Sequence, residues 1–102
     1  LQVLTGLAGS LFAPGLADIE AVRALCLAVS KPVNFMAGIP GKSFPVAELA
    51  AAGVRRVSTA TGLYRAAMTG LLRAAAEIRD TGRFDFLNDV LTTAAINKTM
   101  GL

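Results

Sequence analysis

Short runs of apolar and β-branched residues alternate with longer helical patterns along this chain. Three runs have the character of strands, at residues 11–14, 33–37 and 54–59. After each run, apolar residues recur at spacings of three and four, which predicts a helix with one buried face. Strands that alternate with helices in this way form parallel sheets joined by crossover helices. We therefore expect an α/β fold.

The first of these helices has the clearest start signal. Asp18 stands where an N-cap is expected, and Ile19, Val22 and Cys26 follow it on one face. Pro45 is typical of the first turn of a second, shorter helix. Further helical patterns lie at residues 1–7, 62–79 and 84–94. The helix predicted at 62–79 is rich in small residues, which allow close approach to a neighbour.

The composition suits a surface that is partly covered by further protein. The chain has 102 residues, a hydrophobic fraction of 54% and a mean hydropathy of +0.58, which are high for a free-standing domain of this size. Gly, Pro or a charge interrupts every apolar run before it reaches the ~18–20 residues of a membrane span. We treat residues 1–102 as one partial domain. Its first residue is not Met, which is typical of a processed or truncated chain.

Charge and cysteine content narrow the function classes. The net charge is +3, and Arg55–Arg56 is the one adjacent basic pair, so a nucleic-acid-binding face is not expected. This pair begins the third strand and is interpreted as surface charge. The single cysteine, Cys26, lies within a helical pattern and is interpreted as a core residue. A lone thiol and the absence of a signal-peptide pattern favour a reducing, cytoplasmic location.

The acidic residues do not form a catalytic or metal-binding pattern. None follows a predicted strand, where barrel enzymes place their active sites. The chain has no His, which excludes a Ser-His-Asp triad and imidazole ligation of a metal. The acids are Asp18, Glu20, Glu48, Glu77, Asp80, Asp85 and Asp89.

Polar residues at the ends of the second and third strands are the best candidates for ligand contact. Asn34 lies within a strand, where it meets either a ligand or a backbone or water partner. Ser58 and Thr61 lie directly before a helix, whose first N–H groups bind anions. The other interpretation is a helix cap, in which Thr61 or Thr59 bonds the first turn. Lys42, in the loop after the second strand, is interpreted as solvated, with anion contact as the alternative.

The order and spacing of four segments resemble one enzyme superfamily. The segments are LFAPGL at 11–16, KPVN at 31–34, ELAAAGVRRVS at 48–58 and LYRAA at 63–67. Together they resemble the isocitrate lyase/phosphoenolpyruvate mutase superfamily, and within it the carboxyvinyl-carboxyphosphonate phosphorylmutase and PEP phosphonomutase-like members. The resemblance covers nearly the whole chain but only the C-terminal part of the family. It implies strands six to eight, with the following helices, of a (β/α)8 TIM-type barrel that is incomplete on its own.

The resemblance implies Mg²⁺-dependent lyase or phosphonomutase chemistry on small 2-oxo acids or phosphonates. C–C or C–P bonds are formed or cleaved through an enolate, and the metal ligands lie on earlier strands that this chain lacks. In the lyase branch, an Asn and a hydroxyl residue approach the substrate carboxylate. These positions fall on Met36 and Gly38, which cannot make such bonds, and this departure favours a smaller or different substrate. The resemblance also implies that the position of Thr61 lines the pocket and helps to set specificity. The expected substrate-binding residues are therefore Asn34, Gly38, Ser58 and Thr61, in a fragment that is inactive alone.

The helices predicted after the third strand are candidates for contacts between subunits. The family exchanges its last barrel helix between subunits, which implies a homo-oligomer formed through the C-terminal helices. Packing within the chain is the alternative. Two other functions stay open at this point: a different TIM-barrel enzyme with an anion site after strands seven and eight, or a non-catalytic α/β assembly module.

Overall fold

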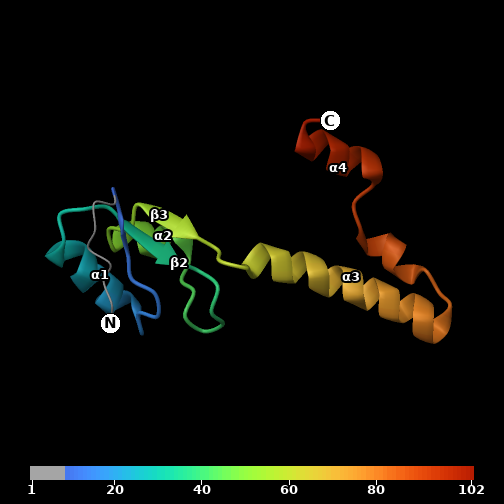
Figure 1. Cartoon of the computed structure of the whole chain (residues 1–102), viewed down its shortest axis with the longest axis horizontal. Coiled ribbons are helices and arrows are strands. Elements are labelled where there is room, and N and C mark those ends of the chain that lie inside the picture. Colours follow the sequence, from blue (N-terminus) through green and yellow to red (C-terminus); the bar gives the residue numbers. More distant parts are fainter. Residues whose placement is uncertain (1–8) are drawn as a thin grey trace. The chain divides into compact units, whose positions relative to one another are not determined.

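The computed structural model describes residues 9–102 (Figure 1), so the helix expected at residues 1–7 lies outside the described residues. Strands and helices alternate along the first part of the chain, as the sequence predicts. They are β1 (Leu11–Phe12), α1 (Ile19–Ala28), β2 (Val33–Met36), α2 (Val46–Ala51), β3 (Arg56–Ser58) and α3 (Gly62–Thr81). A 3-10 helix, η1 (Asp85–Asp89), and α4 (Thr93–Met100) follow.

The strands form one parallel sheet in the order β1-β2-β3. Phe12 pairs with Asn34, and Asn34 pairs with Arg56, so these three residues form one row across the sheet. Met36 pairs with Ser58 in the next row of the same face. The α/β prediction is confirmed, although each strand is shorter than the apolar run that predicted it.

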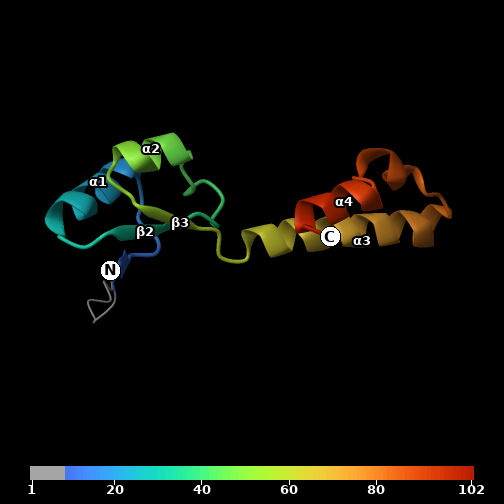
Figure 2. The same cartoon turned by 90° about the horizontal axis from the view of Figure 1, so that it is seen from above.

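The chain divides into two compact units, and the first ends at Arg65. In this first unit, α1 and α2 cover the same face of the sheet (Figure 2). Val22, Phe35 and Leu49 belong to one buried cluster, with exposed fractions of 0%, 4% and 1%. Burial of apolar surface contributes ~25 cal/mol of stabilising free energy per Å², so a buried cluster of this kind stabilises a small sheet.

Local signals hold α1 and α2 in place. The Asp18 carboxylate accepts a hydrogen bond of 2.8 Å from the Ala21 N–H, which confirms the predicted N-cap. The Arg23 guanidinium donates to the Ala51 carbonyl at 3.2 Å and so joins the two helices. After α2 the chain turns at Gly53, whose φ of +101° favours glycine.

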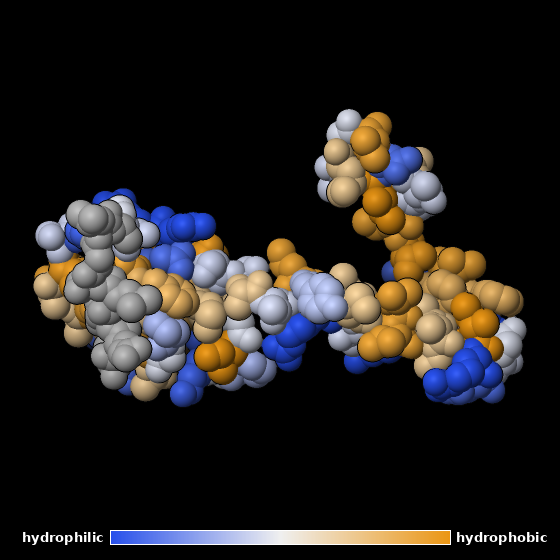
Figure 3. All heavy atoms as spheres, in the orientation of Figure 1, coloured by the Kyte–Doolittle hydropathy of each residue, from blue (hydrophilic) through white to orange (hydrophobic). Residues whose placement is uncertain are grey.

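The second unit, from residue 66 to 102, has a different character. No residue of α3, η1 or α4 is buried. Hydrophobic side chains lie at the surface of these helices (Figure 3). Within residues 66–102, the large ones that are at least half exposed are Leu71, Leu72, Phe84, Leu87, Val90, Leu91, Met100 and Leu102.

The single amphipathic helix expected at 84–94 is wrong. The chain forms η1 and then an extended residue, Val90, with φ −114° and ψ 154°. The Glu77 carboxylate accepts hydrogen bonds from the Asp85 and Phe86 N–H groups at 3.1 and 3.0 Å, which holds the start of η1. The Thr92 hydroxyl accepts one from the Ala95 N–H and starts α4 as a new helix. Hydrophobic spacing alone could not show these two local capping interactions.

No helix in the described part of the chain has both the length and the hydropathy to span a membrane.

Candidate functional site

The candidate site lies at the carboxyl ends of β2 and β3, on the sheet face away from the helices. Val57 packs against the helix-covered cluster, so its neighbours in the strand, Arg56 and Ser58, face the other way. Asn34 shares that face, because its side-chain Nδ2 donates to the Ser58 Oγ at 3.1 Å. The structure thus brings together two of the residues that the sequence singled out.

Asn34 is the one buried polar residue of the described chain, with 8% of its surface exposed. Its Oδ1 is buried and has no hydrogen-bond partner among the described residues. A buried polar atom without a partner costs about 1–3 kcal/mol. Rotating the Asn34 amide group by 180° exchanges its oxygen and its NH₂ group between the same two positions. The group can therefore offer an oxygen or an NH₂ to a ligand while the other end stays on Ser58.

Gly38 brings the loop after β2 against the turn that follows β3. A Cβ at this position would lie 3.2 Å from the Thr59 carbonyl oxygen and 3.3 Å from the Ala60 Cβ. Only a residue without a side chain permits this approach at no cost. Gly38 makes no polar side-chain contact, so its part in the site is to let the two strand ends meet.

The turn between β3 and α3 contains a strained residue. Ala60 has a φ of +48° and is the only non-glycine residue with positive φ in the described chain. The left-handed region costs an L-residue about 1–2 kcal/mol. The Gly62 N–H donates to the Thr59 carbonyl at 2.8 Å and closes this turn. Strain of this kind concentrates at ligand sites and tight turns.

Thr61 is exposed and precedes α3. Its carbonyl accepts the hydrogen bond of the Arg65 N–H at 2.8 Å, so the helix ladder starts here. Within the part of the chain that the structure describes, the Thr59 and Thr61 hydroxyls make no hydrogen bond, so neither caps the helix. Thr61 thus stands at the start of α3 through its carbonyl, and its hydroxyl makes no capping hydrogen bond to the described residues.

The loop that carries Lys42 is ordered by its own backbone. The Lys42 N–H and the Ser43 hydroxyl both donate to the Ile39 carbonyl, at 3.1 and 2.9 Å. The Lys42 residue itself is exposed. The loop thus follows β2 at the same end of the sheet as the Asn34–Ser58 pair.

The described residues do not fit a Mg²⁺ site. Residues 9–102 contain no group of three or more His, Cys, Asp or Glu side chains that could hold a metal ion. Several acids have other partners: Asp18 caps α1, Glu77 holds η1, and Asp80 pairs with Arg79 at 2.6 Å. A hard cation requires several oxygen ligands directed at one point, and the carboxylates here supply no such set.

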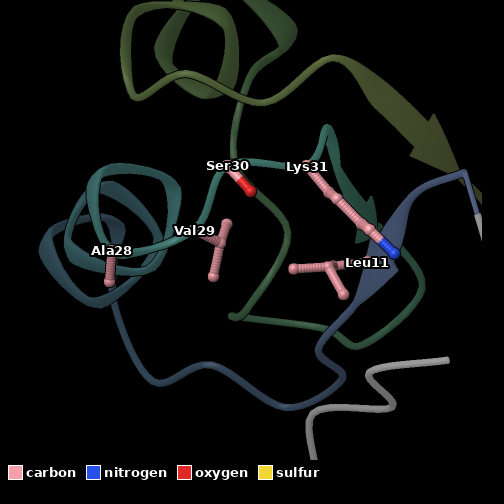
Figure 4. Close-up of a pocket in the computed structure, with 5 residues that line it drawn as sticks. All are labelled: Leu11, Ala28, Val29, Ser30 and Lys31. Carbon is pink, nitrogen blue, oxygen red and sulfur yellow. The ribbon is translucent and has the colours of Figure 1, made fainter.

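Two hollows lie away from the candidate site. One, of about 260 Å³, lies between the end of α1 and the start of β2, beside β1, and its lining residues are shown in Figure 4. The other, of about 340 Å³, lies between α2 and β3. Neither includes Asn34 or Ser58. Apolar residues form most of both linings, and the polar residues among them are Ser30 and Lys31 in the first hollow and Arg55 and Arg56 in the second.

Cys26 is partly buried and packs against the core cluster, as the sequence predicts. Burial raises the pKa of its thiol. A raised thiol pKa lowers the thiolate fraction at neutral pH, so Cys26 is a poor nucleophile.

Two residues of this region escaped the sequence analysis. Ala60 gave no signal, because Ala is not a residue type that favours positive φ. For Arg56, as for Arg55, the sequence pattern favours surface charge. Both are exposed, but Arg56 lies on the same sheet face as Asn34. Strand alternation from Val57 is the signal that separates the two arginines.

Comparisons with known proteins agree with this architecture. A family model described as phosphoenolpyruvate phosphomutase matches residues 6–79. A comparison with curated proteins gives no match. Among solved structures, the chain is similar to "a putative lyase/mutase from Burkholderia cenocepacia J2315", with 40% identity and a TM-score of 0.81. The match covers 94% of this chain and 35% of that one, so the chain spans about a third of that protein's length. The chain belongs to the phosphoenolpyruvate phosphomutase family, within the isocitrate lyase/PEP mutase superfamily, and corresponds to part of a larger lyase/mutase fold.

Proposed function

We propose that this chain is the C-terminal part of a Mg²⁺-dependent lyase or phosphonomutase that acts on a small 2-oxo acid or phosphonate. In this proposal β1, β2 and β3 are strands six to eight of a (β/α)8 barrel. The family match, the parallel strand order and the partial coverage of a larger lyase/mutase support it. The sheet has two free edges, which a closed barrel would pair.

The observation that carries the proposal is the buried Asn34–Ser58 pair. Asn34 is 8% exposed, has one amide end on Ser58 at 3.1 Å, and keeps the other end without a partner. It lies on the sheet face that becomes the barrel interior. A satisfied structural amide would have partners at both ends. The unpaired end is therefore assigned to substrate.

The chain's own residues would bind and orient the substrate rather than carry the bond cleavage. Ser58 and the Asn34 amide would hold one oxygen-rich end of a carboxylate or phosphonate. Thr61 would approach the same end from the start of α3, where free N–H groups favour negative charge. Gly38 would keep the two strand ends close. The described residues do not fit the metal, so its ligands would come from the rest of the barrel.

The test is reconstitution. The 102-residue chain is mixed with the part of the Burkholderia cenocepacia protein that it does not match, produced as a separate polypeptide. Phosphoenolpyruvate and a panel of small 2-oxo acids are offered with Mg²⁺. Phosphorus NMR reports transfer of phosphorus from oxygen to carbon, and a coupled assay reports release of a smaller 2-oxo acid. We expect turnover from the mixture only, and turnover by the isolated chain would contradict the proposal.

Variants then test the assigned residues. Asn34→Leu and Ser58→Ala should each lower kcat/KM of the reconstituted enzyme by about 10- to 100-fold, as expected when one or two charge-assisted hydrogen bonds to substrate are lost. Ser30→Ala is the matched control, because Ser30 is exposed and precedes β2 at the opposite end from the site. Equal activity of Ser58→Ala and Ser30→Ala would remove Ser58 from the site.

A second proposal concerns assembly. We propose that α3 and α4 join copies of this protein into a homo-oligomer. The supporting observation is that neither helix buries a residue, while Leu71, Leu72 and Met100 are 59%, 64% and 71% exposed. Exposed apolar surface on this scale marks an interaction surface. Sedimentation of the full chain should show a dimer or larger species, and Leu71→Glu with Leu72→Glu should convert it to a monomer.

A further inference from the structure

An arginine lies on the open face of the sheet without a partner. Arg56 pairs in register with Asn34 and shares its face, opposite the helix-covered side. Its guanidinium makes no ion pair or hydrogen bond within the described residues. Arg55, its neighbour, has the same charge but lies on the other side of the strand by alternation. Both arginines line the hollow between α2 and β3, but only Arg56 is a residue of β3 and pairs in register with Asn34.

The position of Arg56 sets the kind of partner it needs. β3 is an edge strand of the described sheet, so its free edge is open to pairing with a further strand. The chain covers 35% of a related lyase/mutase, so about two thirds of such a protein is available to cover it. Once covered, a guanidinium lies in low dielectric, where an unpaired charge is strongly unfavourable. A covering segment must therefore bring a negative charge to Arg56.

The position of Arg56 in β3 favours a protein carboxylate over substrate. Arg56 is the first residue of β3, whereas the Asn34 amide beside it is bonded to Ser58, two residues closer to the end of the strand where the candidate site lies. The row that contains Arg56 is completed by Phe12 and Asn34, neither of which is acidic. No strand of the described sheet contains an Asp or Glu. The carboxylate therefore comes from another segment.

We propose that a strand from the remaining part of the barrel pairs with the free edge of β3 and presents an Asp or Glu side chain to Arg56 on the inner face of the sheet. This inference rests on the proposed function, because it requires a barrel that the chain completes. The resulting ion pair would select the register in which β3 pairs with its neighbouring strand. A slip of one residue would leave the Arg56 guanidinium buried without a partner, which is unfavourable.

The test measures the affinity of the full chain for the unmatched part of the Burkholderia cenocepacia protein by titration calorimetry. Wild type, Arg56→Gln, Arg56→Lys and the control Arg55→Gln are compared, with circular dichroism of each free chain. We expect Arg56→Gln to weaken binding by about 30- to 300-fold, as for a buried charge left alone. Arg56→Lys should recover part of the loss, because Lys keeps the charge but not the planar fork. Arg55→Gln should change the affinity less than about threefold, as an exposed charge does.

The partner residue is then found by replacing each Asp and Glu of the added polypeptide with Asn or Gln. One replacement should abolish the difference between wild type and Arg56→Gln, which is the signature of a direct pair in a double-mutant cycle. Arg56→Gln binding as tightly as Arg55→Gln, with normal binding of the wild type, would overturn this inference alone. Failure of the wild type to bind would overturn the proposed function together with it.

Discussion

The two units of this chain differ in the interactions that stabilise them. The first contains a parallel sheet, two covering helices and side chains such as Val22 and Leu49 that are 0% and 1% exposed. The second contains a 3-10 helix, α4 and most of α3, and none of these elements buries a residue. The first unit is stabilised by burial, whereas the second depends on local helix interactions. Such helices gain most of their stability from packing against something else.

The difference explains the composition. A hydrophobic fraction of 54% is high for a small domain, and the surplus apolar residues lie in the second unit and on the open face of the sheet. Phe12 and Met36 are examples on that face, since each shares a row with a residue of the site. The composition is thus what a part of a larger lyase/mutase fold requires, in agreement with the 35% of the related structure that this chain covers.

The largest expected effect tests the buried cluster. Leu49→Ala removes a side chain that is 1% exposed in the first unit, and should lower the free energy of unfolding by about 2–5 kcal/mol through lost burial and a cavity. Leu72→Ala is the matched control in α3, where Leu72 is 64% exposed. It should change that free energy by less than about 0.5 kcal/mol. Urea denaturation followed by circular dichroism measures both, and similar losses would contradict the contrast between the units.

Two glycines give the next contrast, with opposite signs. Gly38→Ala places a Cβ 3.2 Å from the Thr59 carbonyl oxygen, in a turn whose backbone is already fixed, so we expect destabilisation of about 1 kcal/mol. Gly70→Ala meets nothing within 4 Å and lies inside α3. It should stabilise the helix by up to about 1 kcal/mol. Thermal unfolding and helical ellipticity distinguish the two, and a stabilising Gly38→Ala would show that the strand ends can move apart.

Much of the first unit could be predicted from the sequence, because its signals are local. Asp18 has the residue type of an N-cap, and the apolar spacing of α1 matches a helix that covers a sheet. The site could be predicted in part, because Asn34 and Ser58 are polar residues within predicted strands. Their hydrogen bond depends on the register of β2 with β3, which no local pattern encodes. The strained backbone at Ala60 could not be predicted either, because no local sequence pattern encodes it.

The second unit was harder to predict, because hydrophobic spacing does not reveal where a helix is interrupted. The residues of η1 and the start of α4 continue the apolar spacing, yet the chain breaks at Val90. The Glu77 carboxylate stabilises the structure before this break, because it accepts hydrogen bonds from two backbone N–H groups eight and nine residues further along the chain. A contact of this length between a side chain and the backbone has no sequence motif.

Glu77 gives a smaller, local effect. Glu77→Ala removes the acceptor of the Asp85 and Phe86 N–H groups, and each such hydrogen bond to a charged acceptor contributes about 1 kcal/mol or more. Amide hydrogen exchange at these two positions should become about tenfold faster. Exchange in α1 and β2 should not change, because those elements belong to the other unit. Glu48→Ala, in α2, is a control that changes the same residue type elsewhere, and unchanged exchange at Asp85 would show that η1 forms without Glu77.

The smallest expected effect concerns Asp80 at the end of α3. Its hydrogen bonds with the Arg79 guanidinium, at 2.6 and 2.9 Å, lower the pKa of the Asp80 carboxyl below its ordinary value of about 4. A carboxyl with a lowered pKa in the folded state contributes stability above its ordinary pKa, and this contribution is lost as the pH falls through the lowered value.

Because both side chains are exposed to water, the stabilising effect is small, even though the pKa shift itself can be measured. Carbon NMR of the side-chain carboxyl should place the titration midpoint of Asp80 below that of an ordinary aspartate, and Arg79→Gln should return it to the ordinary range. Salt at 1 M should weaken the shift, since the Debye length is then only ~3 Å. An unchanged midpoint in Arg79→Gln would show that the ion pair does not form in solution. The second unit would then retain only its helix caps and the Glu77 contact as specific polar interactions at this end of α3.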